Sequence, residues 1–335
     1  MAVVAVTNRI PASGLEALRA EHEVRAWEHE ECISREECLR LVAGADAVVT
    51  LLTERVDEEF LAVAGPQLQV VANVAVGYNN IDVEACRAHG VIATNTPKVL
   101  TETTADTAFG LMLMVTRRFG EGERIIRSET PWQWGMFYLL GMGLQDKTLG
   151  IVGMGQIGAA MARRAIAFGM DIVYADEHEA APELLAGMPP GAVRRVSFDE
   201  LLRVSDVVSL HCPYLPSTHH LMGAEQFAAM KRTAYIVNSA RGPIIDEEAL
   251  VAALQSGQIA GAGLDVFEKE PAVHPGLLEM DNVVLLPHLG SATTETRAAM
   301  ADLAAANVLA VLRGGAPLTP VTLSLIHISE PTRPY

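Results

Sequence analysis

The chain has 335 residues, of which half are hydrophobic, and its formal net charge is −16. This length is sufficient for two domains, each with its own core. Because nucleic acids and anionic membranes attract basic surfaces, the negative charge argues against both as partners. Four cysteines without CxxC spacing indicate reduced thiols in a cytoplasmic protein, and no His/Cys/Asp spacing suggests a metal site. No apolar run reaches the roughly 18 residues of a membrane span.

Short apolar runs alternate with helical patterns through residues 1–99. The pattern predicts strands at 3–6, 24–27, 47–52, 70–76 and 91–94, with helices after Pro11 and from Ser34, Asp57 and Asp82. This alternation is typical of a parallel sheet covered by helices. Residues 101–127 then read as one long helix.

An aromatic segment follows this helix. Residues 131–143, PWQWGMFYLLGMG, hold two of the three tryptophans of the chain and lack clear periodicity. Such a segment either covers a core or forms a subunit contact, and the sequence leaves both interpretations open.

The alternation of strands and helices resumes at Thr148. Strands are predicted near 149–153, 171–176, 193–196, 207–211, 234–239, 260–265 and 283–287, which together make one doubly wound sheet. An Ala-rich helix is expected from Thr293 to Arg313, where two glycines and a proline end it. His219 and His220 are expected to be solvated residues of a turn before a helix.

A glycine motif lies at the start of this second sheet. The first strand runs into Gly153, Gly155 and Gly158 at GxGxxG spacing, a helix follows, and the next strand delivers Asp176. These are the parts of a dinucleotide site: a tight turn, an open backbone for the pyrophosphate and close packing of helix on strand. A carboxylate at Asp176 would bind ribose hydroxyls and repel a 2′-phosphate, so NAD is favoured over NADP.

Ligands of an open parallel sheet bind beyond the carboxyl ends of its strands. Arg241, Glu270 and His288 all follow predicted strands. Arginine can pair with the carboxylate of a 2-keto acid, and an imidazolium can donate a proton to the keto oxygen. Glu270 would orient His288 and favour its protonated form. Taken singly, each residue also has an ordinary interpretation as a surface ion pair, a turn residue or a loop histidine.

Seven motifs give the chain a specific family resemblance. They are VAVGYNNID (74–82), NTPKVLTETTADTAFGLML (95–113), GMGQIG (153–158), LHCPYLPSTHHL (210–221), NSARGPIIDEEAL (238–250), GLDVFEKEP (263–271) and LLPHLGSAT (285–293). Residues 1 to about 322 resemble the NAD-dependent D-isomer-specific 2-hydroxyacid dehydrogenases, and are most similar to glyoxylate and hydroxypyruvate reductases.

The resemblance implies an α/β fold with two doubly wound parallel-sheet domains. A Rossmann cofactor domain at 100–288 would be inserted into a flavodoxin-like substrate domain formed by 1–99 and 289–322. Residues 323–335, whose sequence resembles a translated sequencing adapter, are interpreted as a non-native tail.

The resemblance also assigns site residues. The catalytic residues would be Arg241, Glu270 and His288, and the substrate carboxylate would be held by Arg241 and by backbone amides around Val76 and Gly77. The cofactor site would comprise Thr104, Gly153, Gly155, Gln156, Ile157, Gly158, Asp176, Cys212, Ala240, Asp265 and Gly290, with Asp265 near the nicotinamide carboxamide.

The expected activity is NADH-dependent reduction of glyoxylate and hydroxypyruvate to glycolate and D-glycerate by a homodimer. A broader D-2-hydroxyacid dehydrogenase that acts on pyruvate or branched keto acids is one alternative. An NAD(H)-sensing corepressor or scaffold of the same fold is another.

Overall fold

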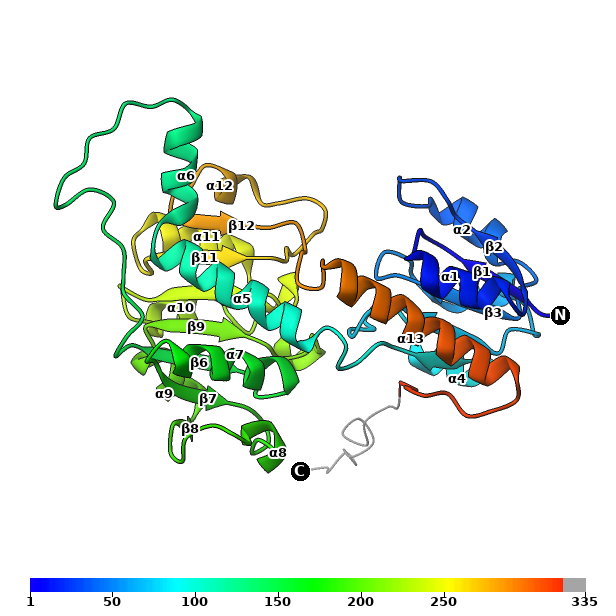
Figure 1. The fold of residues 1–335 in the computed structure, drawn as a ribbon. Coiled ribbons are helices and arrows are strands. Elements are labelled where there is room, and N and C mark those ends of the chain that lie inside the picture. The colour runs from blue at the N-terminus through cyan, green and yellow to red at the C-terminus, as the bar shows by residue number, and fades with distance from the viewer. Residues whose placement is uncertain (322–335) are drawn as a thin grey trace, which may run out of the picture. The chain divides into compact units, whose positions relative to one another are not determined.

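The chain divides into two compact units. In this computed structural model, which describes residues 1–321, unit 1 comprises Met1–Leu100 and the chain from Ala292 onward, and unit 2 comprises Thr101–Ser291. The predicted tail at 323–335 lies outside the described residues. Each unit has its own parallel sheet and its own layers of helices (Figure 1).

Unit 1 contains a five-stranded parallel sheet in the order β2-β1-β3-β4-β5. This is the strand order of flavodoxin-like folds. The central strands β3 and β4 are buried along their whole length, as expected for strands covered on both faces. The strands are β1 (Val3–Val6), β2 (Glu23–Ala26), β3 (Ala47–Thr50), β4 (Val70–Asn73) and β5 (Ile92–Thr94).

Helices cover both faces of this sheet. They are α1 (Ala12–Arg19), α2 (Arg35–Val42), α3 (Glu58–Ala64), α4 (Val83–Ala88) and α13 (Thr294–Leu312). The α2, α3 and α4 helices share one core with the sheet, whereas α13 packs against α1, β3 and β4 (Figure 1). A Cβ atom at Gly14 would lie 2.8 Å from the Ala301 carbonyl oxygen, so glycine permits this close helix contact.

Unit 2 contains a seven-stranded parallel sheet in the order β12-β11-β10-β9-β6-β7-β8. The chain starts in the middle at β6, moves to β7 and β8 on one side, and then crosses to β9 and beyond. This is the Rossmann order, with its switch point between β6 and β9, and it confirms the predicted fold class. The strands are β6 (Thr148–Val152), β7 (Asp171–Ala175), β8 (Val193–Arg195), β9 (Val207–Leu210), β10 (Tyr235–Asn238), β11 (Gly261–Leu264) and β12 (Val283–Leu285).

The helices of unit 2 separate into two layers. On one face α5 and α7 pack against the sheet, and α9, α10 and α11 contribute to the core of the other face. The elements are α5 (Thr101–Thr116), α6 (Phe119–Arg127), α7 (Gln156–Ala167), α8 (Pro182–Leu185), α9 (Phe198–Val204), α10 (Ala224–Ala229), α11 (Glu247–Gln255), α12 (Pro275–Leu278) and the short 3₁₀ turns η1 (Pro216–Thr218) and η2 (Gly242–Ile244).

The prediction of one helix over 101–127 was wrong. The helix breaks into α5 and α6 at Arg118, which adopts a left-handed conformation with φ of 54°. Arg118 Nε and Nη2 each donate a hydrogen bond of 2.7 Å to the Glu121 carboxylate. These bonds tie the breaking residue to the first turn of α6. Because Arg118 is neither glycine nor proline, its residue type gives no sign of the break.

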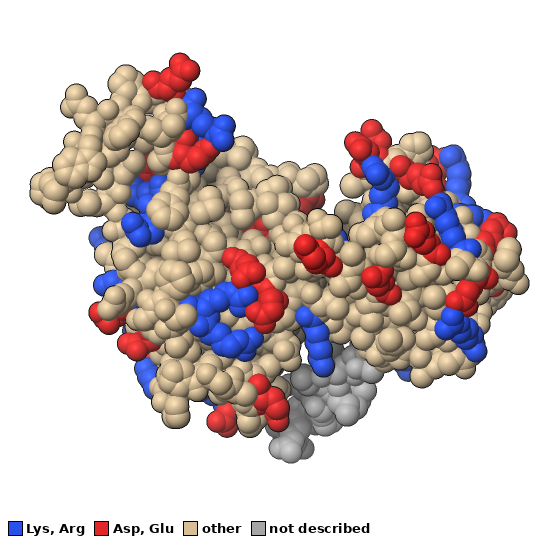
Figure 2. All heavy atoms as spheres, viewed as in Figure 1, with Lys and Arg blue, Asp and Glu red and all other residues tan. Residues whose placement is uncertain are grey.

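The aromatic segment at 131–143 does not cover a core. Trp134 is 79% exposed and Phe137 is 89% exposed. No residue of the preceding α6 is buried. We call residues 128–143 the arm, whose outer part carries no charged residue from 131 to 143 (Figure 2). Among residues 1–321, no helix is long and apolar enough to cross a bilayer.

Candidate active site

The glycine turn between β6 and α7 has the three features that a dinucleotide requires. Gly153 has φ of 93°, and a Cβ atom there would lie 2.6 Å from the Cys212 backbone nitrogen. At Gly158 a Cβ atom would lie 2.2 Å from the Gly153 carbonyl oxygen, so only glycine lets the helix pack this closely. A Cβ atom at Gly155, in contrast, would have no neighbouring atom within 4 Å, so this residue faces open space.

Asp176 lies immediately after β7 and is joined to this turn. Its Oδ2 accepts a hydrogen bond of 2.7 Å from the Met154 backbone N–H. Arg195, at the end of β8, donates to the carbonyl oxygens of Asp176 and Glu177 at 2.8 and 2.9 Å. The carboxylate is thus held at the glycine turn, with a guanidinium on the backbone beside it.

The three predicted catalytic residues follow three neighbouring strands of unit 2. Arg241 follows β10, Glu270 follows β11, and His288 follows β12. His288 Nδ1 lies 2.8 Å from Glu270 Oε2, and the second oxygen of Glu270 accepts a 3.0 Å hydrogen bond from the Phe267 N–H.

Electrostatics distinguish the members of this trio. Burial alone would raise the pKa of Glu270, but the hydrogen bond and charge of His288, the Phe267 N–H and the charge of Arg241 together lower it. Burial lowers the pKa of Arg241, and the charge of Glu270 opposes this effect. Arginine nonetheless remains cationic because its ordinary pKa is so high. Glu270 is therefore a carboxylate that can orient an imidazole and stabilise its positive form.

Asp265 fixes the backbone around His288. Its carboxylate is fully buried and accepts hydrogen bonds from the N–H groups of Leu289 at 2.6 Å and Gly290 at 2.8 Å. Its own carbonyl accepts the His288 N–H at 2.8 Å. These bonds hold His288 in a left-handed conformation, with φ of 54°, which is unusual for a residue other than glycine.

Two further predicted cofactor residues lie near these groups. The buried Thr104 side chain would be 3.4 Å from a Cβ atom at Gly290, so α5 meets the loop after β12 here. The Ala240 N–H donates to the Asn238 side chain, whose amide nitrogen donates to the Arg241 carbonyl. Asn238 therefore shapes the loop that carries Arg241.

Val76 and Gly77 belong to unit 1, where they follow β4. The Val76 carbonyl accepts a hydrogen bond of 2.8 Å from the Asn95 side chain, and the Gly77 carbonyl accepts one of 2.9 Å from the Asn73 side chain. The N–H groups of Val76 and Gly77 take no part in these two bonds. The two asparagine side chains fix the peptides that were predicted to bind a carboxylate.

Comparisons with known proteins place these features in one family. Residues 109–290 match the family described as D-isomer specific 2-hydroxyacid dehydrogenase, NAD binding domain. The glyoxylate reductase of Thermococcus onnurineus (strain NA1) is 46% identical, and the alignment covers 98% of each chain. The chain belongs to the D-isomer specific 2-hydroxyacid dehydrogenase family.

Solved structures show the same relationship. The crystal structure of a glyoxylate reductase from Paecilomyes thermophila has a TM-score of 0.86 at 36% identity, covering 96% of this chain and 98% of the other. An NADPH-dependent glyoxylate/hydroxypyruvate reductase from Sinorhizobium meliloti, in complex with NADP and malonate, has a TM-score of 0.80 at 34% identity, covering 96% of each chain.

The nicotinamide cofactor of this dehydrogenase family fits the residues present. The α7 helix begins at Gly155 without a side-chain cap, so the N–H groups of its first turn remain available to an anion at an open backbone. Gln156 and Ile157 form that first turn. Burial raises the pKa of Cys212 to about 12, so this predicted cofactor residue offers a neutral thiol. Among residues 1–321, no group of His, Cys, Asp and Glu is arranged to hold a metal ion.

Sequence reasoning missed several residues that fix the backbone around the predicted site residues. Asn73, Asn95 and Asn238 were overlooked although each stands at or just after a strand, which is the signal that could have found them. The expectation that His220 is only a solvated turn residue was wrong. Its Nε2 lies 3.1 Å from Glu268 Oε1, and its side chain is 35% exposed. His219 is exposed, as expected.

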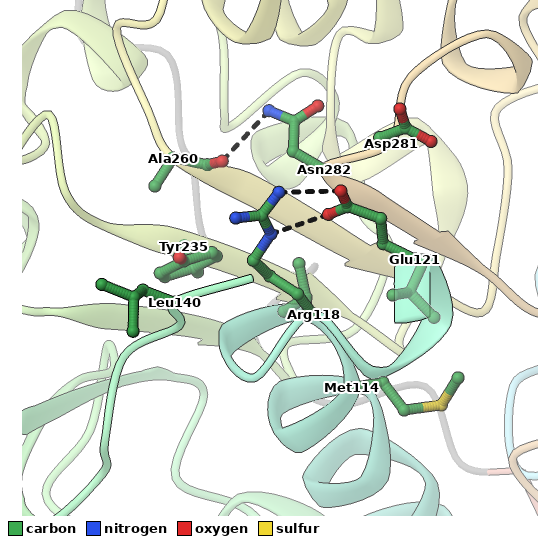
Figure 3. A pocket seen from close by; sticks show the side chains of 10 residues that line it. Met114, Arg118, Glu121, Leu140, Tyr235, Ala260, Asp281 and Asn282 are labelled. Carbon is green, nitrogen blue, oxygen red and sulfur yellow. Dashed lines mark hydrogen bonds and ion pairs between the residues drawn. The ribbon is translucent and has the colours of Figure 1, made fainter. Parts of the chain in front are cut away.

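A cavity of about 350 Å³ lies elsewhere in unit 2. Figure 3 shows the paired Arg118 and Glu121 with Tyr235 and with Leu140 of the arm, all of which line this cavity. Tyr235 begins β10, and Asn282, another lining residue, precedes β12. The cavity therefore lies toward the amino ends of these strands, whereas Arg241, Glu270 and His288 follow carboxyl ends, so the cavity is separate from the predicted catalytic residues.

Proposed function

We propose that this enzyme reduces glyoxylate and hydroxypyruvate with NADH, giving glycolate and D-glycerate. The observation that carries the proposal is the 2.8 Å contact of His288 with Glu270 beside the strand end that holds Arg241. These groups match the needs of a 2-keto acid: a cation for its carboxylate and a proton for its carbonyl oxygen. The two relatives named glyoxylate reductase direct the proposal to the smallest substrates of the class.

Each residue of the chain has a distinct role in this proposal. Arg241 pairs with the substrate carboxylate and polarises the keto oxygen, and the N–H groups of Val76 and Gly77 are carboxylate donors that unit 1 offers. Protonated His288 donates its proton to the keto oxygen as negative charge develops there, and Glu270 holds the imidazole in place. The nicotinamide, when bound, supplies the hydride. In the reverse reaction, neutral His288 accepts the proton.

We also infer a division of labour between the units. Unit 2 holds NAD(H) at the glycine turn, with Asp176 on the adenosine ribose, Asp265 near the carboxamide, and Thr104, Cys212, Ala240 and Gly290 along the cofactor. Unit 1 contributes Val76 and Gly77 and so binds substrate. A cytoplasmic location is supported by four free cysteines.

The arm supports a homodimer. Its exposed aromatic side chains, together with the absence of charge from 131 to 143, have the composition of the apolar centre of a protein interface. A second copy of the chain is the occupant that we propose for this surface.

Steady-state kinetics test the activity. NADH and NADPH oxidation is measured with glyoxylate, hydroxypyruvate, pyruvate and 2-ketoisocaproate, and we expect the first two keto acids to give the highest kcat/KM with NADH. His288→Ala should lower kcat by about 100-fold or more, because it removes the proton donor. Arg241→Ala should also raise the KM of the keto acid strongly, because it removes the cation.

Three outcomes would contradict the proposal. Normal turnover by both variants would exclude this trio from catalysis. Preference for pyruvate or 2-ketoisocaproate would favour a broader D-2-hydroxyacid dehydrogenase. Cofactor binding without turnover of any of the four acids would favour a scaffold that senses NAD(H).

A further inference from the structure

A cluster of polar residues outside the catalytic trio joins the loops that follow β9, β10 and β11. Glu247 is the first residue of α11, Glu268 lies in the loop after β11, and His220 lies in the loop after β9. The Glu268 N–H donates a 2.8 Å hydrogen bond to Glu247 Oε1, and the Glu247 N–H donates a 3.4 Å bond to Glu268 Oε2. We call this reciprocal pair the glutamate clamp.

His220 completes the cluster from the third loop. Its Nε2 lies 3.1 Å from Glu268 Oε1, and its backbone N–H donates to the Pro243 carbonyl at 2.9 Å. The side chain and the backbone of one residue therefore contact two different catalytic loops. Pro243 belongs to the loop of Arg241, and Glu268 belongs to the loop of Glu270.

Glu247 is only 6% exposed, and a carboxylate is an unusual group to bury. Burial raises its pKa, the Glu268 N–H lowers it, and the nearby Glu268 carboxylate raises it again. Two carboxyl groups in such proximity disfavour each other when both are charged. An apolar side chain at position 247 would fill the space without that electrostatic cost. The carboxyl oxygen of Glu247 therefore has a role beyond filling space, which is to accept the Glu268 N–H.

A second observation shows how tightly the two loops are joined. A Cβ atom at Gly242 would lie 1.9 Å from both the carbonyl carbon and the carbonyl oxygen of Phe267. Gly242 directly follows Arg241. The backbone beside Arg241 thus lies against the peptide that joins Phe267 to Glu268.

That peptide is also the link to catalysis. The Phe267 N–H binds the Glu270 carboxylate, while the next N–H along the chain, that of Glu268, binds Glu247. Two consecutive N–H groups therefore connect a buried carboxylate of α11 to the carboxylate that orients His288. Displacement of this short segment would change the position of Glu270 relative to both His288 and Arg241.

We propose that Glu247 is a positioning residue, whose carboxyl oxygen holds the Glu268 N–H and thereby places Glu270 against His288. The inference rests on the proposed role of this trio in keto-acid reduction. Glu247 contacts neither substrate nor cofactor in this proposal. Its effect is on the rate of proton donation and not on the binding of the keto acid.

Three variants of the full-length enzyme separate positioning from charge. Glu247→Ala removes the acceptor and should lower kcat by about tenfold, because small displacements of a catalytic group have large effects on rate. The KM of the keto acid should change less than about threefold. Glu247→Gln retains an oxygen that can accept the Glu268 N–H, so it should restore kcat to near the wild-type value. Glu248→Ala is the matched control, because the neighbouring Glu248 side chain is 85% exposed.

Two kinetic results would overturn the proposal. One is a wild-type kcat in Glu247→Ala, and the other is an equal loss in Glu247→Ala and Glu247→Gln, which would assign the effect to charge. If Glu247→Ala does not fold, Glu247→Asp replaces it, because the shorter side chain withdraws the acceptor while it keeps the charge. Wild-type kcat in the folded Asp variant would then refute the role.

Hydrogen–deuterium exchange provides a readout that does not need turnover. The backbone amides of Phe267 and Glu268 should exchange about tenfold faster in Glu247→Ala than in wild type, and at the wild-type rate in Glu247→Gln. If these amides exchange faster in Glu247→Ala but wild type reduces no keto acid, the proposed function is wrong, while Glu247 still holds the Glu268 backbone. If wild type reduces keto acids but the exchange rates in Glu247→Ala equal those of wild type, only the positioning role of Glu247 is refuted.

Discussion

Asp176 combines a charge with a fixed position. The Met154 N–H of the glycine turn holds one of its oxygens, so in the proposed role the carboxylate is already in place for a ribose. The Arg195 guanidinium binds the backbone carbonyls of Asp176 and Glu177. Its positive charge would attract a 2′-phosphate, and the negative charge of the Asp176 carboxylate opposes that attraction. We therefore expect the balance of these two charges to set the preference between NADH and NADPH.

Replacement of Asp176 by Ser should therefore reverse the preference. We expect NADPH kcat/KM to rise by about tenfold and NADH kcat/KM to fall, because a like charge is removed and Arg195 is left to pair with the phosphate. Kinetics with both cofactors at a fixed glyoxylate concentration measure the change. The double variant Asp176→Ser, Arg195→Gln is the control and should lose the gain. An unchanged cofactor ratio in Asp176→Ser would mean that Asp176 does not discriminate between the cofactors.

At the residue scale, sequence reasoning could select side chains that stand directly after predicted strands. Arg241, Glu270 and His288 were predicted from their positions after strands, and the Glu270–His288 contact is present. Glu247 escaped this reasoning because it reads as an ordinary acidic residue in the first turn of a helix. Its partner lies 21 residues away in the chain, so only the folded loops bring the two together.

Strands β6 and β9 lie on either side of the switch point of the unit 2 sheet. Asp206, which directly precedes β9, links the N-terminal ends of the two strands. Its carboxylate accepts the Thr148 N–H and the Lys231 ammonium, each at 2.9 Å, and its side chain is 16% exposed. Burial alone would raise the pKa of Asp206, but these two partners together lower it. The ionised carboxylate consequently stabilises the folded sheet.

Replacement of Asp206 by Asn should lower the melting temperature at pH 7. Loss of one charge-assisted contact costs about 1–2 kcal/mol, which corresponds to roughly 2–8 °C for a unit of this size. Because the folded-state pKa is below the unfolded value, the stabilisation is complete above about pH 5 and is lost as the pH falls through the folded-state pKa. Melting curves of wild type and variant should therefore converge under acidic conditions.

The control for this prediction is Asp171→Asn, at the exposed first residue of β7. It should change the melting temperature by much less. A difference between Asp206→Asn and wild type that persists at the lowest pH would assign the effect to packing and not to ionisation.

At the element scale, periodicity predicted the strands and the order of helices well, because buried parallel strands are continuous apolar runs. It failed at the junction of α5 and α6, since apolar spacing continues through Arg118 while the backbone does not. The break depends on the local bonds of Arg118 with Glu121, which no periodic pattern encodes.

At the scale of the whole molecule, the arm exposes aromatic side chains in a segment, residues 131–143, that carries no charge. If a second copy covers it, light scattering should give twice the 35.9 kDa mass of the chain. Trp134→Ser together with Phe137→Ser should shift the protein to monomer by removing exposed aromatic area from the contact. Val63→Ser is the control, because Val63 is 40% exposed on α3 and belongs to unit 1, not to the unit that carries the arm. Wild-type protein that is monomeric at micromolar concentration would refute the dimer.

The contact of α13 with α1, β3 and β4 has a consequence for biosynthesis. Strand alternation puts Val49 and Val70 on the sheet face opposite to Val48 and Val71, which belong to the core with α2, α3 and α4. The ribosome must make the roughly 190 residues of unit 2 before α13 emerges, which takes about 10–40 s at ordinary rates of elongation. During that interval the nascent first hundred residues lack a helix that their sheet needs, so unit 2 can finish folding before unit 1 does.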